Sequence, residues 1–160
     1  MNHLLYYCHT HTNAKLRYHA SDMILHIHSD ASYNSEARAR SQAGGHFYLG
    51  NNVYVSPTMH NNGSILNTST IMRNVTAFAS EAECGAHLNN TKEYVSLCTT
   101  LHKMGHPHPP TPFEVDNSTA VGFANKQIKQ QKSKSMDMRY YWILIANAEI
   151  GRASLAIKGP

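Results

Sequence analysis

Four carboxylates lie at points of this 160-residue chain where a predicted strand ends or a predicted helix runs. They are Asp30, Glu83, Asp116 and Asp137. Acids that converge on one point repel each other strongly unless divalent cations lie among them. Carboxylate oxygens without Cys or several His favour Mg²⁺ or Mn²⁺ over Zn²⁺. Two such ions, about 3.5–4 Å apart, form the standard apparatus for phosphodiester cleavage. If the four acids meet, they predict a metal-dependent nuclease.

The first and third acids each follow a short apolar run. Residues 23–28 are rich in Ile and Leu and too short for a helix, so they predict a strand that ends in a turn at residues 29–32. Residues 112–116 predict another short strand. If the two strands are neighbours, their acids lie at one end of a sheet. His26 and His28 share the face of Asp30 by the two-residue alternation and could be metal ligands, but packing as neutral side chains is the favoured interpretation.

The second acid, Glu83, lies in a long helical pattern. Ser80 to Glu83 has the form of a capping box, and Gly105 is the expected helix stop. The predicted buried stripe also carries the acid inward, which a cap alone does not explain; its apolar members are Ala86, Tyr94, Leu97, Leu101 and Met104. Asp137 opens a last predicted helix after Ser135, where the helix dipole by itself favours an Asp.

The remaining pattern predicts an α/β fold with one mixed sheet. Strands are expected over residues 43–50 and 63–70, with loops at 34–42 and 51–62. Three consecutive short strands favour an antiparallel meander. A weak last strand is predicted within residues 151–157.

Length and composition predict one domain over residues 23–160, after a loosely ordered lead-in at residues 1–22. The alternative for the lead-in is a zinc site at Cys8, His9 and His11, although this spacing matches no standard zinc module. The formal net charge of +4 permits a polyanionic partner without demanding one. A basic segment, residues 126–134, is either a solvated loop or a contact to backbone phosphates.

Several functional classes are not supported. No apolar stretch reaches the length of a membrane span, and the N-terminus does not have the form of a signal peptide. The three cysteines form no disulfide framework, so we expect an intracellular, cytoplasmic protein, with a virus-like particle or the nucleus as alternatives. Phosphate-binding loops of the P-loop and dinucleotide types are absent. No His follows His108, which argues against a Ser or Cys nucleophile.

Taken together, the acidic segments resemble the ribonuclease H domain of copia-type LTR retrotransposon polyproteins. The resemblance covers residues 15–143, nearly the whole chain, and four motifs occur in the right order, each with its acid. The segments are SDASY (29–33), ASEAECGA (79–86), VDNSTAVGFAN (115–125) and KSMDMRYYWI (134–143), with RSQAGGHFYLG (40–50) and MGHPHPPTPFEVDNSTA (104–120) as spaced matches.

This resemblance implies a ribonuclease H-like fold, with three antiparallel strands followed by parallel strands and flanking helices. It implies a metal-dependent endonuclease that cuts the RNA strand of RNA–DNA hybrids, using two Mg²⁺ or Mn²⁺ ions and following a reverse transcriptase in one polyprotein. Asp30 would bridge both ions, and the other three acids would complete the set. The expected nucleic-acid contacts are Ser32, Asn117, Ser118, Lys132 and Lys134.

The chain also departs from the family in two places. The loop before the last helix has no His, which in many ribonucleases H helps the product to leave. Residues from about 144 to 160 lack the usual charged positions, which predicts a degenerate C-terminal part. The alternative function is therefore a catalytically inactive retroelement remnant that binds nucleic acid or serves as a structural module. An integrase-like nuclease fits poorly, because Glu149 would have to supply its last acid.

Overall fold

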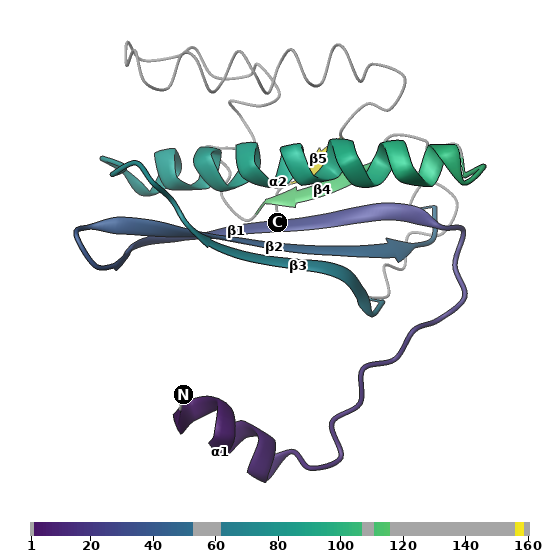
Figure 1. Cartoon of the computed structure of the whole chain (residues 1–160), viewed down its shortest axis with the longest axis horizontal. Coiled ribbons are helices and arrows are strands. Elements are labelled where there is room, and N and C mark those ends of the chain that lie inside the picture. Colours follow the sequence, from purple (N-terminus) through teal and green to yellow (C-terminus); the bar gives the residue numbers. More distant parts are fainter. Residues whose placement is uncertain (1, 53–61, 107–110, 116–155, 159–160) are drawn as a thin grey trace.

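The computed structural model describes residues 2–52, 62–106, 111–115 and 156–158 (Figure 1). These residues form an α/β fold of two helices and five strands. In chain order they are α1 (Asn2–Thr10), β1 (Ile24–Glu36), β2 (Arg40–Gly50), β3 (Ser64–Ile71), α2 (Ala79–Lys103), β4 (Pro112–Val115) and β5 (Ala156–Lys158). None of the described helices is long and apolar enough to cross a membrane.

The five strands form one mixed sheet in the order β3-β2-β1-β4-β5. β1 pairs antiparallel with β2, and β2 pairs antiparallel with β3, which confirms the predicted meander. β4 lies parallel to β1, and β5 lies parallel to β4. The predicted mixed sheet, antiparallel and then parallel, is therefore confirmed, and β5 lies at the end of the segment in which a last strand was predicted.

The first hairpin is longer than the sequence pattern predicted. The expected turn at residues 29–32 and the expected loop at 34–42 are both wrong, because β1 continues to Glu36 and β2 begins at Arg40. The turn lies at residues 37–39, where Arg38 and Ala39 have positive φ angles of 64° and 52°. The second half of β1 is polar, so its strand conformation depends on pairing with β2 rather than on local propensity.

The core lies between the sheet and α2, which covers one face of the sheet (Figure 1). Its members come from β1, β2, α2 and β4; they are Leu25, Ile27, Phe47, Tyr94, Leu101, Phe113 and Val115. The predicted stripe of α2 is correct at Tyr94 and Leu101 but wrong at Met104, which is 65 % exposed. Met104 is the C-cap residue and follows the last residue of α2.

The start of α2 differs from the prediction, whereas its end agrees with it. The expected capping box of Ser80 and Glu83 is wrong: the N-cap is Phe78, and its side chain makes no cap hydrogen bond. Instead, the Ala77 N–H donates to Oε2 of Glu81 over 2.8 Å. At the other end, Gly105 has a φ of 88°, a conformation that favours glycine and ends the helix as predicted.

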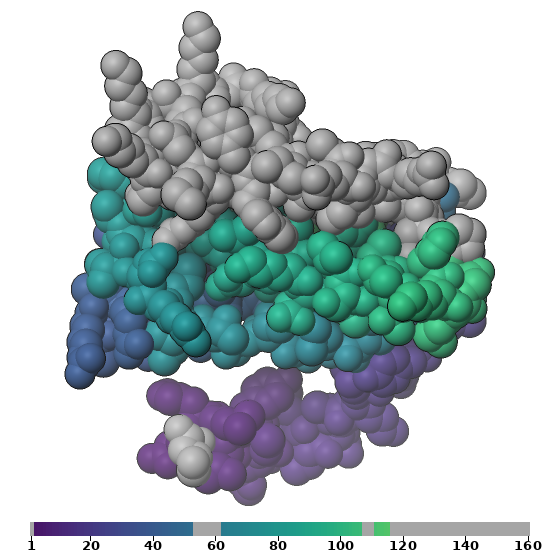
Figure 2. All heavy atoms as spheres, turned by 45° about the horizontal axis from the view of Figure 1, so that its top comes forward, coloured from purple at the N-terminus to yellow at the C-terminus, as the bar shows by residue number. Residues whose placement is uncertain are grey.

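The lead-in contains a helix, α1, that the sequence pattern did not predict. α1 has no buried residue and lies on the side of the sheet opposite α2 (Figures 1 and 2). The chain joins the sheet only after α1: the Arg17 carbonyl accepts a hydrogen bond from the Gly63 N–H at 3.1 Å, and the Tyr18 hydroxyl donates to the Ser64 carbonyl at 3.0 Å.

Candidate active site

Asp30 lies near the middle of β1, not at the end of the strand as the sequence predicted. It pairs with Gly44 of β2 on one side. On the other side, the preceding residue, Ser29, pairs with Val115 of β4. Asp30 is exposed to solvent, so the expected cost of burying this acid does not arise. Its own backbone pairs with β2, and the residue before it pairs with β4, which fixes its position.

Glu83 points into the protein, as the helical stripe predicted. It is 6 % exposed, and it shares its side of α2 with His87 and Asn90, which are 3 % and 1 % exposed. These residues recur at steps of four and three, so they lie along one face of the helix. Glu81 is buried as well, but its carboxylate accepts the hydrogen bond from the Ala77 N–H at the start of the helix. The two neighbouring acids therefore have separate environments, and only Glu83 belongs to the face that carries Asn90.

Asn90 joins α2 to three strands of the sheet. Its Nδ2 donates to Oγ of Ser29 in β1 and to the Gly44 carbonyl in β2, both at 2.8 Å. Its Oδ1 accepts from the Thr68 hydroxyl in β3 at 3.1 Å. Gly45 makes this possible, because a Cβ at that position would collide with the Asn90 and Thr68 side chains. These bonds fix the height and rotation of α2 over the acidic part of β1.

The backbones that carry Asp30 and Glu83 also approach each other. Ala31, the residue after Asp30, packs against a small buried cluster that includes Ala82 and Ala86 of α2. Small side chains at these positions allow the helix to lie close to the sheet. By alternation, Ser29 and Ala31 face α2, and Asp30 lies between them on the other side of the strand.

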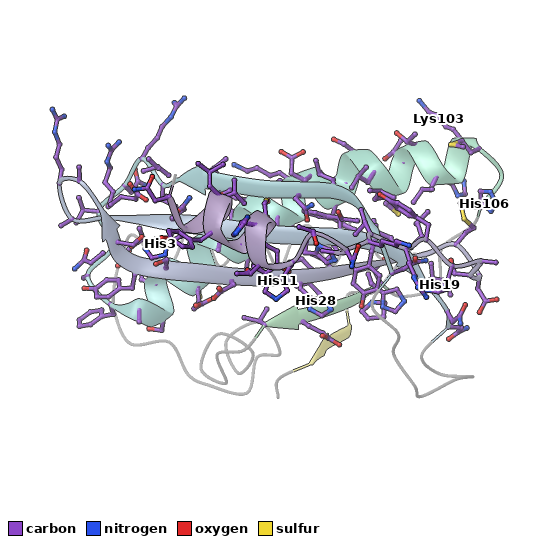
Figure 3. The ribbon with its side chains drawn as sticks, turned by 90° about the horizontal axis from the view of Figure 1, so that it is seen from below. His3, His11, His19, His28, Lys103 and His106 are labelled. Carbon is purple, nitrogen blue, oxygen red and sulfur yellow. The ribbon has the colours of Figure 1, made fainter. Side chains whose placement is uncertain are left out.

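His28 and Tyr48 occupy this other face of the sheet, where they pack together. Nε2 of His28 lies 3.0 Å from the Tyr48 hydroxyl and 3.0 Å from Oε2 of Glu114. Burial and, secondarily, the charge of Glu114 raise the pKa of Tyr48 to about 12. The His26 ring stacks on Tyr48 with 5.1 Å between centroids. Figure 3 shows His28 on the face opposite α2. The packing interpretation of both histidines therefore agrees with their contacts.

The other predicted site residues divide into two groups. Ser32 lies in β1 and is exposed. The rest lie outside the described residues; they are Asp116, Asn117, Ser118, Lys132, Lys134 and Asp137. Within residues 2–52, 62–106, 111–115 and 156–158, no three His, Cys, Asp or Glu side chains are grouped to hold a metal ion. The alternative zinc site in the lead-in is not formed there, whereas the four-acid set stays a prediction because only two members are described.

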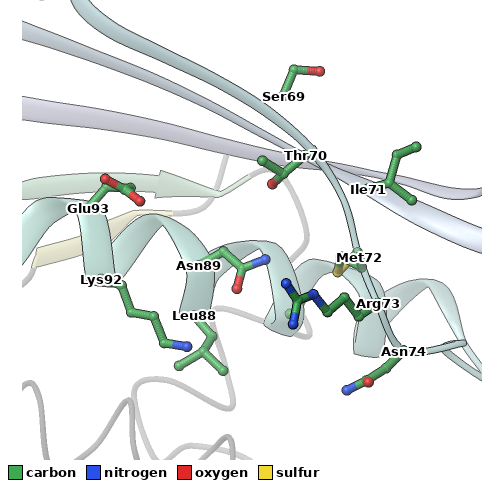
Figure 4. Close-up of a pocket in the computed structure, with 11 residues that line it drawn as sticks. Ser69, Thr70, Ile71, Met72, Arg73, Asn74, Leu88, Asn89, Lys92 and Glu93 are labelled. Carbon is green, nitrogen blue, oxygen red and sulfur yellow. The ribbon is translucent and has the colours of Figure 1, made fainter.

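A pocket of about 860 Å³ lies between α2 and the C-terminal half of β3, and the sequence pattern gave no sign of it (Figure 4). Its cations come from both sides: Arg73 follows β3, and Lys92 lies on α2. Thr70 and Leu88 also line it. No local motif connects these residues, because the pocket arises only when α2 lies on the sheet.

Comparison with known proteins identifies the fold. No protein-family model matches the sequence, and no curated protein matches it significantly. Among solved structures, the chain is similar to LC11 ribonuclease H1, isolated from compost by a metagenomic approach and crystallised with an RNA/DNA hybrid. The TM-score is 0.61 at 10 % identity, over 85 % of this chain and 84 % of that one.

Two further structures give the same result. The N-terminal ribonuclease H domain of a Mycobacterium tuberculosis protein matches with a TM-score of 0.58 at 11 % identity, over 86 % of this chain and 83 % of that one. Ribonuclease H1 of Halobacterium salinarum matches with a TM-score of 0.53 at 10 % identity, over 88 % and 86 %. The predicted ribonuclease H-like fold is thereby confirmed.

Proposed function

We propose that this domain is a metal-dependent endonuclease that hydrolyses the RNA strand of RNA–DNA hybrids. The observation that carries the proposal is the position of Asp30 in the ribonuclease H fold. Ser29 and Val115 are paired in the parallel strands β1 and β4, and in the sequence these residues are followed by Asp30 and Asp116. This register supports the proposal that the two acids lie close to each other.

The donor set suits a hard divalent cation. Asp30, Glu83, Asp116 and Asp137 would supply only carboxylate oxygens to two Mg²⁺ or Mn²⁺ ions. When bound, such ions activate the attacking water and stabilise the leaving oxygen. The chain's own contribution is to hold the acids on rigid elements: Asp30 lies within a paired strand, and the helix of Glu83 is fixed by Asn90.

Contacts to the nucleic acid belong to the same proposal. The exposed position of Ser32 on β1, two residues beyond Asp30, suits a contact to a 2′-hydroxyl of the RNA strand. The remaining proposed contacts are Asn117, Ser118, Lys132 and Lys134. The resemblance to copia-type retrotransposon polyproteins extends the proposal, because a preceding reverse transcriptase would produce the hybrid that this domain cuts.

The proposal is tested with a labelled RNA strand, offered as an RNA–DNA hybrid or as an RNA–RNA duplex, with Mg²⁺ or with EDTA. We expect cleavage of the hybrid alone, and only with Mg²⁺. Asp30→Asn and Glu83→Gln should each reduce the rate at least about 100-fold, because each removes a charged metal ligand.

Two neighbouring acids provide matched controls. Asp22 accepts a hydrogen bond from the Asn52 N–H at 3.0 Å, and Glu81 closes the start of α2. Asp22→Asn and Glu81→Gln remove the same charge outside the proposed site, so cleavage should persist. If the wild type cleaved the hybrid no faster than Asp30→Asn does, the proposed nuclease function would be wrong. A retained hybrid gel shift in that case would favour the inactive nucleic-acid-binding remnant.

A further inference from the structure

β3 is an edge strand of the sheet formed by the described residues, and its part from Leu66 to Ile71 contains no charge, Pro or bulge. Its sequence, SILNTSTI, contains no charged residue and no Pro. Natural sheets guard an edge with Lys, Pro, bulges or a covering element, because its unpaired N–H and C=O groups otherwise accept another strand. The single irregularity in its pairing with β2 lies at its first residues and leaves Leu66 to Ile71 regular.

The two faces of β3 differ in a regular way. Leu66 packs against the core, and the Thr68 hydroxyl donates to Asn90, so the even positions from 66 to 70 face α2. The odd positions from 67 to 71 lie on the opposite face, where Asn67 bonds to His46 at 2.7 Å and Ile71 is 44 % exposed. Ile65, at the irregularity in the pairing with β2, is 43 % exposed. The edge thus carries an exposed isoleucine near each end.

This pattern is self-complementary about Thr68. If β3 meets a second β3 antiparallel with Thr68 at the two-fold axis, each Ile65 lies opposite Ile71 of the second copy. In the same register, Asn67 lies opposite Ser69, and Leu66 lies opposite Thr70. We propose that β3 is a homodimerisation edge, through which two copies of this chain form one continuous ten-stranded sheet.

The α2 side of the edge has room for this arrangement. Thr70 lines the pocket beside α2 together with Leu88. Leu66 of the second copy would lie next to Thr70, at the edge of this space.

A second copy fits this edge better than an unrelated strand. β3 has no charged residue that could pair with an opposite charge on a different strand. In the antiparallel register about Thr68, its isoleucines lie opposite isoleucines and its polar residues lie mostly opposite polar residues. An interface with two-fold symmetry also closes after two subunits and leaves no β3 edge open for further growth.

The register is tested by sedimentation velocity over micromolar to sub-millimolar protein. We expect the wild type to dimerise with rising concentration. The like-charge variants I65K/I71K and I65E/I71E should each raise the dissociation constant at least about tenfold, because like charges then lie opposite each other in both pairs. Since these variants change the net charge in opposite directions, a shared loss of dimer excludes a general charge effect.

The opposite-charge variant I65K/I71E provides the decisive comparison. It places a lysine opposite a glutamate in both pairs, so dimerisation should return toward the wild-type dissociation constant. Val75 is 63 % exposed and lies beyond β3, so Val75→Lys should leave the dimer unchanged. Circular dichroism verifies that each variant is folded. A wild type that stays monomeric, or an opposite-charge variant as weak as the like-charge ones, would overturn the proposal.

Discussion

The His87 imidazole is buried against the Phe113 ring, with 4.1 Å between ring centroids. Neither of its ring nitrogens has a hydrogen-bond partner among the described residues. Burial lowers the pKa of His87 from its ordinary value of about 6.5 to about 4. The side chain is therefore neutral at pH 7 and contributes as an apolar ring beside Phe113.

A pH dependence of stability follows from this burial. Below about pH 6.5 the unfolded chain binds a proton at His87 and the folded chain does not, so the free energy of unfolding falls until about pH 4. The full loss is on the order of 3 kcal/mol. Urea unfolding at pH 7.5, 6 and 5 should show a smaller decline in His87→Leu than in the wild type.

Exposed His102 near the end of α2 provides the control for this measurement. His102→Gln should retain the wild-type decline, because it leaves the buried His87 imidazole in place. An equal decline in wild type and His87→Leu would contradict the assignment of this pH dependence to His87.

At the scale of elements, the packing of α2 on the sheet depends on Asn90. Asn90→Ala removes the partner of the buried Ser29 hydroxyl and of the half-buried Gly44 carbonyl and Thr68 hydroxyl. We expect the free energy of unfolding to fall by about 2–4 kcal/mol, measured by urea denaturation.

The next residue along the helix, Asn89, is half-buried and lines the pocket. Asn89→Ala serves as the matched control and should change the free energy of unfolding by less than about 1 kcal/mol. If both alanine variants unfolded at the same urea concentration, the network centred on Asn90 would not be what holds the helix in place.

Where local sequence determines an element, the prediction agrees with the structure. Residues 63–70 predicted a strand that runs from Ser64 to Ile71, because its β-branched residues favour strands wherever they pack. The second half of β1 was missed, because its polar residues adopt the strand only through their partners in β2. The helix stop at Gly105 was predicted correctly, but the helix start was not. Either Glu81 or Glu83 could accept a hydrogen bond at the start of the helix, and in the structure Glu81 accepts one from the Ala77 N–H.

The candidate site shows the same division. Glu83 was identified from its place on the helical stripe, and its burial agrees. Asp30 was identified from the preceding apolar run, although the strand continues past it. The pocket with Arg73 and Lys92 was not found, because its walls come from elements that meet only in three dimensions.

At the scale of the whole molecule, residues 17–19 already bond to residues 62–64, before the predicted domain start at Met23. Tyr18 donates to the Ser64 carbonyl, and its ring lies where a Cβ on Gly63 would be. His19 also pairs with Asn62, whose Oδ1 accepts from the His19 N–H at 2.8 Å. By contrast, no residue of α1 is buried.

Truncation should separate these two parts of the lead-in. A chain that begins at Lys15 should melt within about 1 °C of the full chain, because it loses only exposed residues. A chain that begins at Met23 should lose about 1–3 kcal/mol, because the hydrogen bonds of Arg17, Tyr18 and His19 are removed. Thermal melting by circular dichroism measures both, and similar losses for the two truncations would show that α1 stabilises the domain.

The parallel pairing of β1 with β4 has a consequence for the order of folding. β1, β2 and β3 are consecutive, so their antiparallel ribbon can form from contacts that are near in sequence. Ile27 reaches Phe113 only after β2, β3 and α2 have been passed, and such distant pairing is slow because a long loop must close first. During refolding, β1 therefore pairs with β4 late, and the proposed nuclease activity should return with the slowest structural phase.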